Sequence, residues 1–198
     1  MVARIELDAA TPNQREKREL IIAAAREVLA REGLAACTAR AVADASPLTK
    51  SSVHYYFRDV DEIVDQAMSA HLDAVLGTLR HAADAEPNPT ERPWRVIDTY
   101  LTTFRDKPHA ALLWFEYWID LSRRGATGSI ADDLSRIRSF LRAVLLDAQH
   151  PDADAAADAT LSWLLGAVVQ QNVAPRPDHT RRSELQRLLA PSADRPLA

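Results

Sequence analysis

Side chains that can form hydrogen bonds with a charged or polar partner gather between residues 38 and 57, in the stretch TARAVADASPLTKSSVHYYF. Hydroxyls, basic groups, a histidine ring and tyrosines are suited to DNA, because arginine can make two hydrogen bonds to guanine while hydroxyls mainly contact phosphates. The residues that we expect to contact DNA are Thr38, Arg40, Thr49, Lys50, Ser51, Ser52, His54, Tyr55 and Tyr56. The spacing of Tyr56 also fits a core residue, and both roles stay open.

Two short helices joined by a tight turn are predicted to position these side chains. Thr38 and Thr49 can cap them, because a threonine hydroxyl accepts a hydrogen bond from an N–H group at a helix start. Pro47 is expected to end the first helix, since proline disfavours the helical conformation of the preceding residue. Val53 and Phe57 fall on one buried face of the second helix. The pattern predicts a helix-turn-helix, whose second helix enters the major groove.

This stretch resembles the DNA-binding region of the TetR family of bacterial repressors. The resemblance covers roughly residues 14–80 and rests on Thr38, Arg40, Val42-Ala43, Leu48-Thr49-Lys50 and Val53-His54-Tyr55-Tyr56-Phe57. Pro47 and Ser51 stand where the family usually has glycine, which bears on the geometry of the turn and helix. His54 and Val60 replace a tyrosine and a lysine that commonly touch phosphate, which should weaken affinity for the DNA backbone.

The rest of the sequence is predicted to be helical, because 47% of the residues are apolar and only 5 are glycine. We expect an all-α protein of about nine helices. An N-terminal three-helix DNA-binding head would span residues 1–60, and a C-terminal ligand-binding and dimerisation body would span residues 61–198. The resemblance implies that a helix over about residues 60–83 connects them. Further helices are predicted over about residues 93–106, 108–124, 129–148, 152–173 and 180–190.

Charge and composition limit the partners of the protein. The net charge is −4, but residues 1–60 carry 9 basic and 8 acidic side chains, so the acidic excess lies in the body. Non-specific DNA affinity should therefore be modest and strongly salt-dependent. Arg15, Lys17 and Arg18 either meet phosphate or form a solvated charged turn. We expect a cytoplasmic protein without a membrane partner, since a signal peptide, a membrane-spanning run and paired cysteines are all missing from the sequence.

The aromatic residues of the body allow two interpretations. Rings at helical spacing commonly form core, yet ligand cavities between helices are lined by aromatic rings and a few polar groups. The residues expected to line a ligand site are Tyr100, Phe104, Trp114, Tyr117, Trp118 and Trp163, with Glu116, His109, Gln170, Gln171 and Asn172 as polar candidates. Residues 114–118 resemble the family branch that senses choline-like compounds, which aromatic rings attract through cation–π contacts. A neutral hydrophobic ligand is the alternative.

The last two helices carry more apolar surface than one body needs to bury. We therefore predict a homodimer, whose interface includes Leu161, Leu164, Leu165, Val168, Leu185 and Leu188. The family resemblance implies a four-helix interface. Two-fold symmetry would then place two recognition helices about one DNA turn apart, roughly 34–36 Å.

The sequence offers no metal-ligand spacing and no paired acid/base or nucleophile set, so we expect no metal, no cofactor and no enzymatic activity. The resulting prediction is a sequence-specific DNA-binding transcriptional regulator. It would be a repressor that an unknown small-molecule inducer releases from double-stranded operator DNA. The alternative is a helical small-molecule-binding protein or enzyme that does not bind DNA.

Overall fold

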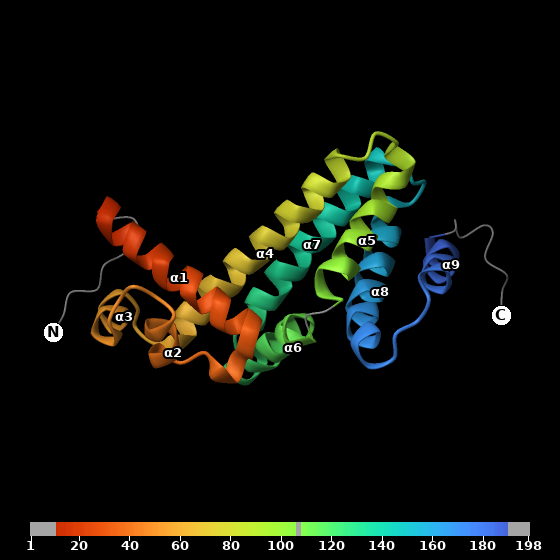
Figure 1. The fold of residues 1–198 in the computed structure, drawn as a ribbon. Coiled ribbons are helices and arrows are strands. Elements are labelled where there is room, and N and C mark those ends of the chain that lie inside the picture. The colour runs from red at the N-terminus through yellow and green to blue at the C-terminus, as the bar shows by residue number, and fades with distance from the viewer. Residues whose placement is uncertain (1–10, 106–107, 190–198) are drawn as a thin grey trace. The chain divides into compact units, whose positions relative to one another are not determined.

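The computed structural model describes residues 11–105 and 108–189, where all regular structure is helical (Figure 1). These residues form nine α-helices and two short 3-10 helices, so the all-α prediction is confirmed. The elements are α1 (Pro12–Glu32), η2 (Leu34–Ala36), α2 (Ala39–Asp44), α3 (Lys50–Tyr56), α4 (Val60–Asp84), η3 (Pro89–Glu91), α5 (Arg92–Phe104), α6 (Pro108–Arg123), α7 (Thr127–Asp147), α8 (Ala153–Val173) and α9 (Asp178–Leu189). Each predicted helix occurs, with ends shifted by less than a turn.

The chain forms two compact units, residues 1–73 and residues 74–198. Helix α4 is continuous across this division and contributes residues to both units. The predicted functional boundary after residue 60 falls at the first residue of α4, and it stays a prediction.

The N-terminal unit is built on α1, which packs against α2 and α3, while these two helices pack against each other. Its core includes Ile21 of α1, Val42 of α2 and Val53 of α3, each at most 1% exposed. Gly33 ends α1 at a φ of 81°, a conformation that glycine adopts without a steric cost. Apolar residues on one face of each short helix therefore fix how the three helices meet.

A buried arginine joins three helices of this unit. Arg18 of α1 is 6% exposed. Its guanidinium donates hydrogen bonds to the backbone carbonyl of Tyr56 and, at 3.0 Å, to the Glu62 carboxylate. The guanidinium carbon also lies 4.1 Å from the centre of the Phe57 ring. Arg18 is therefore neither a phosphate contact nor part of a solvated turn, because its partners in the fold lie far from it in the sequence.

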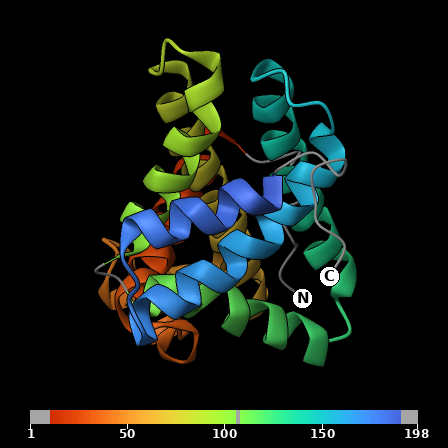
Figure 2. The same cartoon turned by 90° about the vertical axis from the view of Figure 1, so that its right-hand side faces the viewer.

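The C-terminal unit is a bundle arranged around α8, which packs against α5, α6, α7 and α9. Figure 2 shows α9 running beside α8 on one side of this unit. The α8 side chains Leu161, Leu164 and Val168 are each at most 5% exposed. Gln171 of α8 donates to the Leu101 carbonyl of α5 at 3.1 Å, which fixes these two helices by a buried polar contact. Along the described ranges, no helix combines the length and apolarity needed to cross a membrane.

We predict that Arg18→Met lowers the free energy of unfolding of the N-terminal unit by about 2–4 kcal/mol, because Glu62 and the Tyr56 carbonyl lose their shared donor. Urea unfolding followed by far-UV circular dichroism measures this change. Arg31→Met is the matched control, since Arg31 forms ion pairs with Glu27 and Glu32 on the surface of the same helix. Equal effects of the two substitutions would contradict a special role for Arg18.

Candidate DNA-binding surface and ligand site

Hydroxyl side chains cap both short helices of the N-terminal unit. The Thr49 hydroxyl oxygen accepts from the Ser52 N–H at 3.2 Å and lies 3.0 Å from the Ser52 hydroxyl. The Thr38 hydroxyl accepts from the Ala41 N–H at 3.1 Å. Both capping predictions are confirmed. Because these contacts fix the first turn of each helix, they also fix the direction in which the neighbouring side chains project.

The turn between α2 and α3 accommodates proline without strain. Ser46 accepts from the Leu48 N–H at 3.2 Å through its hydroxyl, which closes the turn around Pro47. Positive φ angles in the described chain occur only at Gln149, Gly33 and Gly125, so no residue of this turn is left-handed. A glycine is therefore not required where the family usually has one.

Helix α3 exposes a polar face and buries an apolar one. Of its predicted DNA contacts, Lys50, Ser51, His54 and Tyr55 are exposed, whereas Ser52 and Tyr56 are half-buried. The Tyr56 ring packs edge-to-face against the Tyr55 ring, with centroids 5.1 Å apart. Val53 and Phe57 are at most 2% exposed, as expected for core residues.

Arg40 extends from α2 with 84% of its side chain exposed. Its guanidinium is 3.7 Å from the Asp44 carboxylate one turn along the helix. Exposed pairs of this kind contribute little free energy, so Arg40 can exchange Asp44 for a DNA acceptor at small cost. The contacts of these side chains with DNA remain predictions.

The sequence profile of "Bacterial regulatory proteins, tetR family" matches residues 21–67, which include α2, α3 and the start of α4. The helix-turn-helix region of the chain is therefore similar to that of TetR-family proteins. The match is to a family of regulatory proteins and not of enzymes, in agreement with the prediction. The chain is also 34% identical over 80 residues to the HTH-type transcriptional repressor KstR2 of Mycobacterium tuberculosis. That match covers 40% of this chain and 39% of the relative.

Solved structures extend the likeness of fold to nearly the whole chain. A transcriptional regulator from Rhodococcus sp. Rha1 superposes with a TM-score of 0.69 and 21% identity, over 87% of this chain and 93% of that one. A TetR transcription regulator from Haloarcula marismortui gives a TM-score of 0.72 at 18% identity, over 88% and 97%. At these identities the likeness describes the fold and not the ligand or operator.

The predicted ligand residues of α5 and α6 pack with one another. Phe104 is 2% exposed in a core cluster, and Tyr100 packs against it with ring centroids 5.0 Å apart. Trp114 lies 6.2 Å from Tyr117 and 6.0 Å from Trp118, measured between ring centroids. These contacts are those of core aromatics, and a ligand role for these rings stays a prediction. The side chains of His109 and Asn172 lie outside the described part of the structure.

A cavity of about 350 Å³ lies between α5, α8 and α9. Its apolar walls include Trp94, Ile97, Leu101, Trp163 and Leu185, so Trp163 is the predicted ligand residue that lines it. Sequence reasoning missed the other lining residues, because their partner helices are distant in the sequence. The available signal was the seven-residue spacing of Trp94 and Leu101, which places them on one face of α5.

Four residues of the predicted dimer interface are buried within the single chain: Leu161, Leu164, Val168 and Leu185, each at most 5% exposed. Helices of their own chain cover these side chains and leave them little surface for a second copy, so their interface role stays a prediction. Leu165 is half-buried and Leu188 is 38% exposed, so these two retain accessible surface. The sequence did not single out Val173, which is 81% exposed at the end of α8. The periodicity identified the apolar stripe but not the helices that cover it.

Cys37 is predicted to react slowly with thiol reagents in the folded protein. Burial raises the pKa of the Cys37 thiol to about 11, because the thiolate is penalised more than the thiol. The folded chain therefore holds this proton more tightly than the unfolded chain. Its contribution to stability is present at neutral pH and is lost between about pH 9 and 11.

Labelling with a chromogenic disulfide reagent at about pH 8 measures this difference, with urea-unfolded protein for comparison. Ser51→Cys in a Cys37→Ser background supplies an exposed control thiol. Reaction of native Cys37 at the rate of that control would show that the thiol is accessible.

Proposed function

We propose that this protein is a transcriptional repressor that binds operator DNA as a homodimer and is released by a small molecule. The observation that carries the proposal is the α2–α3 pair, with its apolar residues buried and Arg40, Lys50, Ser51, His54 and Tyr55 exposed together. The match to the repressor KstR2 over 80 residues supports the same role. Neither helix alone is long enough to be stable in water, so the exposed polar surface forms only when the whole unit is folded.

DNA recognition would divide between bases and phosphates. Arg40 and Lys50 are proposed to read base edges, while hydroxyls and N–H groups at the α3 start position the helix on phosphates. Residues 1–60 carry 9 basic and 8 acidic side chains, so their net positive charge is small. The affinity for DNA should therefore depend on specific contacts and fall steeply with salt concentration. His54 lacks the phenol that the family commonly uses at this position, which is consistent with weak backbone binding.

The proposed dimer would use the accessible ends of α8 and α9. Leu165 is half-buried on α8, and Val173 at the end of the same helix is 81% exposed. Leu188 of α9 adds a further exposed apolar side chain. A two-fold axis through this surface would give the two recognition helices a fixed separation.

Release by a ligand would be a population shift. A ligand that binds better to a state with wrongly spaced recognition helices lowers operator affinity by the ratio of its affinities for the two states. We propose a choline-like compound as the ligand of the aromatic segment 114–118. Titration with choline, followed by tryptophan fluorescence, tests that assignment.

Arg40→Ala is expected to weaken binding to the preferred operator by roughly 1–3 kcal/mol and to relax preference at one position in each half-site. The operator is first selected from random duplexes with the unmodified protein, and affinities are then measured by fluorescence anisotropy. Arg31→Ala is the control, since Arg31 lies in the last turn of α1 and is not one of the proposed DNA contacts. Equal weakening on every sequence would make Arg40 a phosphate contact instead.

Replacing exposed apolar residues with Glu is expected to give monomers with weakened operator binding, because an interface cannot bury an unpaired carboxylate cheaply. The double variant Leu188→Glu, Val173→Glu tests this, with molar mass measured by light scattering. Leu146→Glu is the matched control, since Leu146 is 48% exposed on α7. A monomeric unmodified protein would exclude the dimer, and an unchanged dimer in the double variant would exclude this surface.

A further inference from the structure

We propose that the cavity between α5, α8 and α9 binds a small organic anion with a flat apolar body, such as an aromatic carboxylate. The volume of about 350 Å³ lies in the range of small-molecule sites, about 300–1,000 Å³. Binding itself is independent of the proposed function, and only its effect on DNA rests on it.

The apolar part of the cavity is formed by buried and half-buried side chains. Ile97 and Leu101 of α5 are each 4% exposed, and Leu185 of α9 is fully buried. The half-buried rings of Trp94 and Trp163 also line the cavity, from α5 and α8. Large planar side chains beside a firm aliphatic wall suit a flat apolar group, which would bury surface without reordering the helices.

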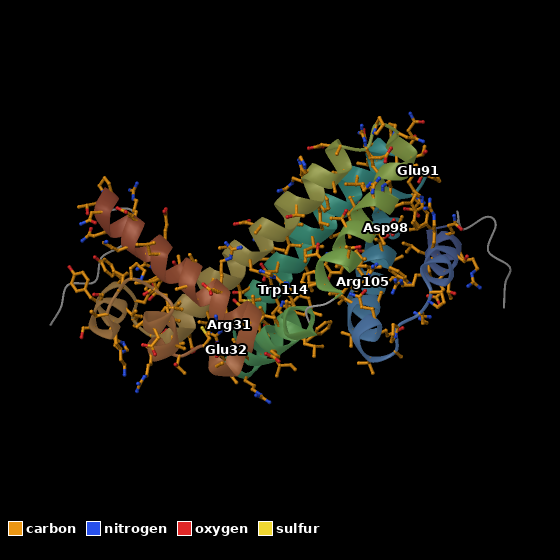
Figure 3. All side chains as sticks on the ribbon, viewed as in Figure 1. Arg31, Glu32, Glu91, Asp98, Arg105 and Trp114 are labelled. Carbon is orange, nitrogen blue, oxygen red and sulfur yellow. The ribbon has the colours of Figure 1, made fainter. Side chains whose placement is uncertain are left out.

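The polar part of the cavity is mainly basic. Three guanidinium groups line it, Arg105 from the residue after α5 and Arg181 and Arg182 from α9, against one carboxylate, Asp98. Figure 3 labels Asp98 on α5 and Arg105 at its C-terminal end. Arg105 forms no ion pair with any residue in the described ranges, so a ligand could be its partner. A guanidinium binds a carboxylate through two parallel hydrogen bonds, which favours this ligand class.

Arg182 is held in place before any ligand binds. Its guanidinium donates to the Glu91 carboxylate at 2.9 Å, and its central carbon lies 4.9 Å from the centre of the Trp94 ring. These contacts tie α9 to the start of α5. A held guanidinium loses less conformational entropy when it binds an anion, so Arg182 contributes preorganised positive charge.

The same charges exclude other ligand classes from this cavity. Even with Glu91 paired to Arg182 and Asp98 in the lining, a quaternary ammonium ion would lie near an excess of positive charge, which the two indole rings would not offset. A neutral ligand of the same shape would fill the apolar part but would offer Arg105 no charged acceptor. Selectivity for the anion over its neutral isostere is therefore the property that defines the site.

Isothermal titration of the full chain with 2-naphthoate and with its neutral isostere, 2-naphthamide, tests the proposal. We expect 2-naphthoate to bind about tenfold more tightly, because charge-assisted hydrogen bonds exceed neutral ones in strength. Arg105→Gln should remove most of this preference while leaving amide binding unchanged. Circular dichroism would check that the variant is folded.

Arg95→Gln and Arg187→Gln are matched controls, because these arginines lie on α5 and α9 but do not line the cavity. Both should retain the preference for 2-naphthoate. Equal affinities of the two compounds for the unmodified protein, an unchanged preference in Arg105→Gln, or no heat up to about 1 mM ligand would each overturn the proposal.

A separate measurement distinguishes this site from the proposed repressor function. If 2-naphthoate is an inducer analogue, it must weaken operator binding by the same factor by which the operator weakens 2-naphthoate binding. Selective binding of 2-naphthoate without an effect on DNA would support the site and refute its coupling to the operator. Failure to bind any DNA would refute the repressor proposal and leave the titration result intact.

Discussion

The hydrogen bonds of Arg18 determine how α3 is held in the N-terminal unit. Helix α3 has only seven residues, so its stability must come from tertiary contacts. The carbonyl groups at a helix C-terminus lack partners within the helix, and Arg18 supplies a donor to one of them at Tyr56. Glu62 neutralises the buried guanidinium and also accepts from the Arg58 N–H at 3.0 Å. The end of α3 and the start of α4 are thereby fixed to α1.

Features that depend on neighbours within four residues could be predicted from the sequence. The caps at Thr38 and Thr49 and the end of α1 at Gly33 are of this kind, and together they identify the helix-turn-helix. The role of Arg18 could not be predicted, because Tyr56 and Glu62 lie 38 and 44 positions away. The sequence shows that a charge is present there, but only the fold shows that it is buried.

In the body, periodicity identified apolar stripes without identifying what covers them. Leu161 and Leu185 belong to such stripes, yet neighbouring helices of the same chain cover them and leave little surface for a second copy. The cavity was missed for a related reason. Its basic wall combines Arg105 with Arg182, which become neighbours only when α9 packs against the bundle. Features formed by distant helices require the tertiary arrangement.

The cavity draws all its lining residues from the second unit, between Trp94 and Leu185, whereas every proposed DNA contact lies in the first. This separation has an evolutionary consequence. After gene duplication, substitutions on α9 can change the proposed ligand of a daughter protein without altering α3. Substitutions on α3 can likewise change the proposed DNA contacts while the cavity stays the same. The two proposed specificities can therefore diverge independently.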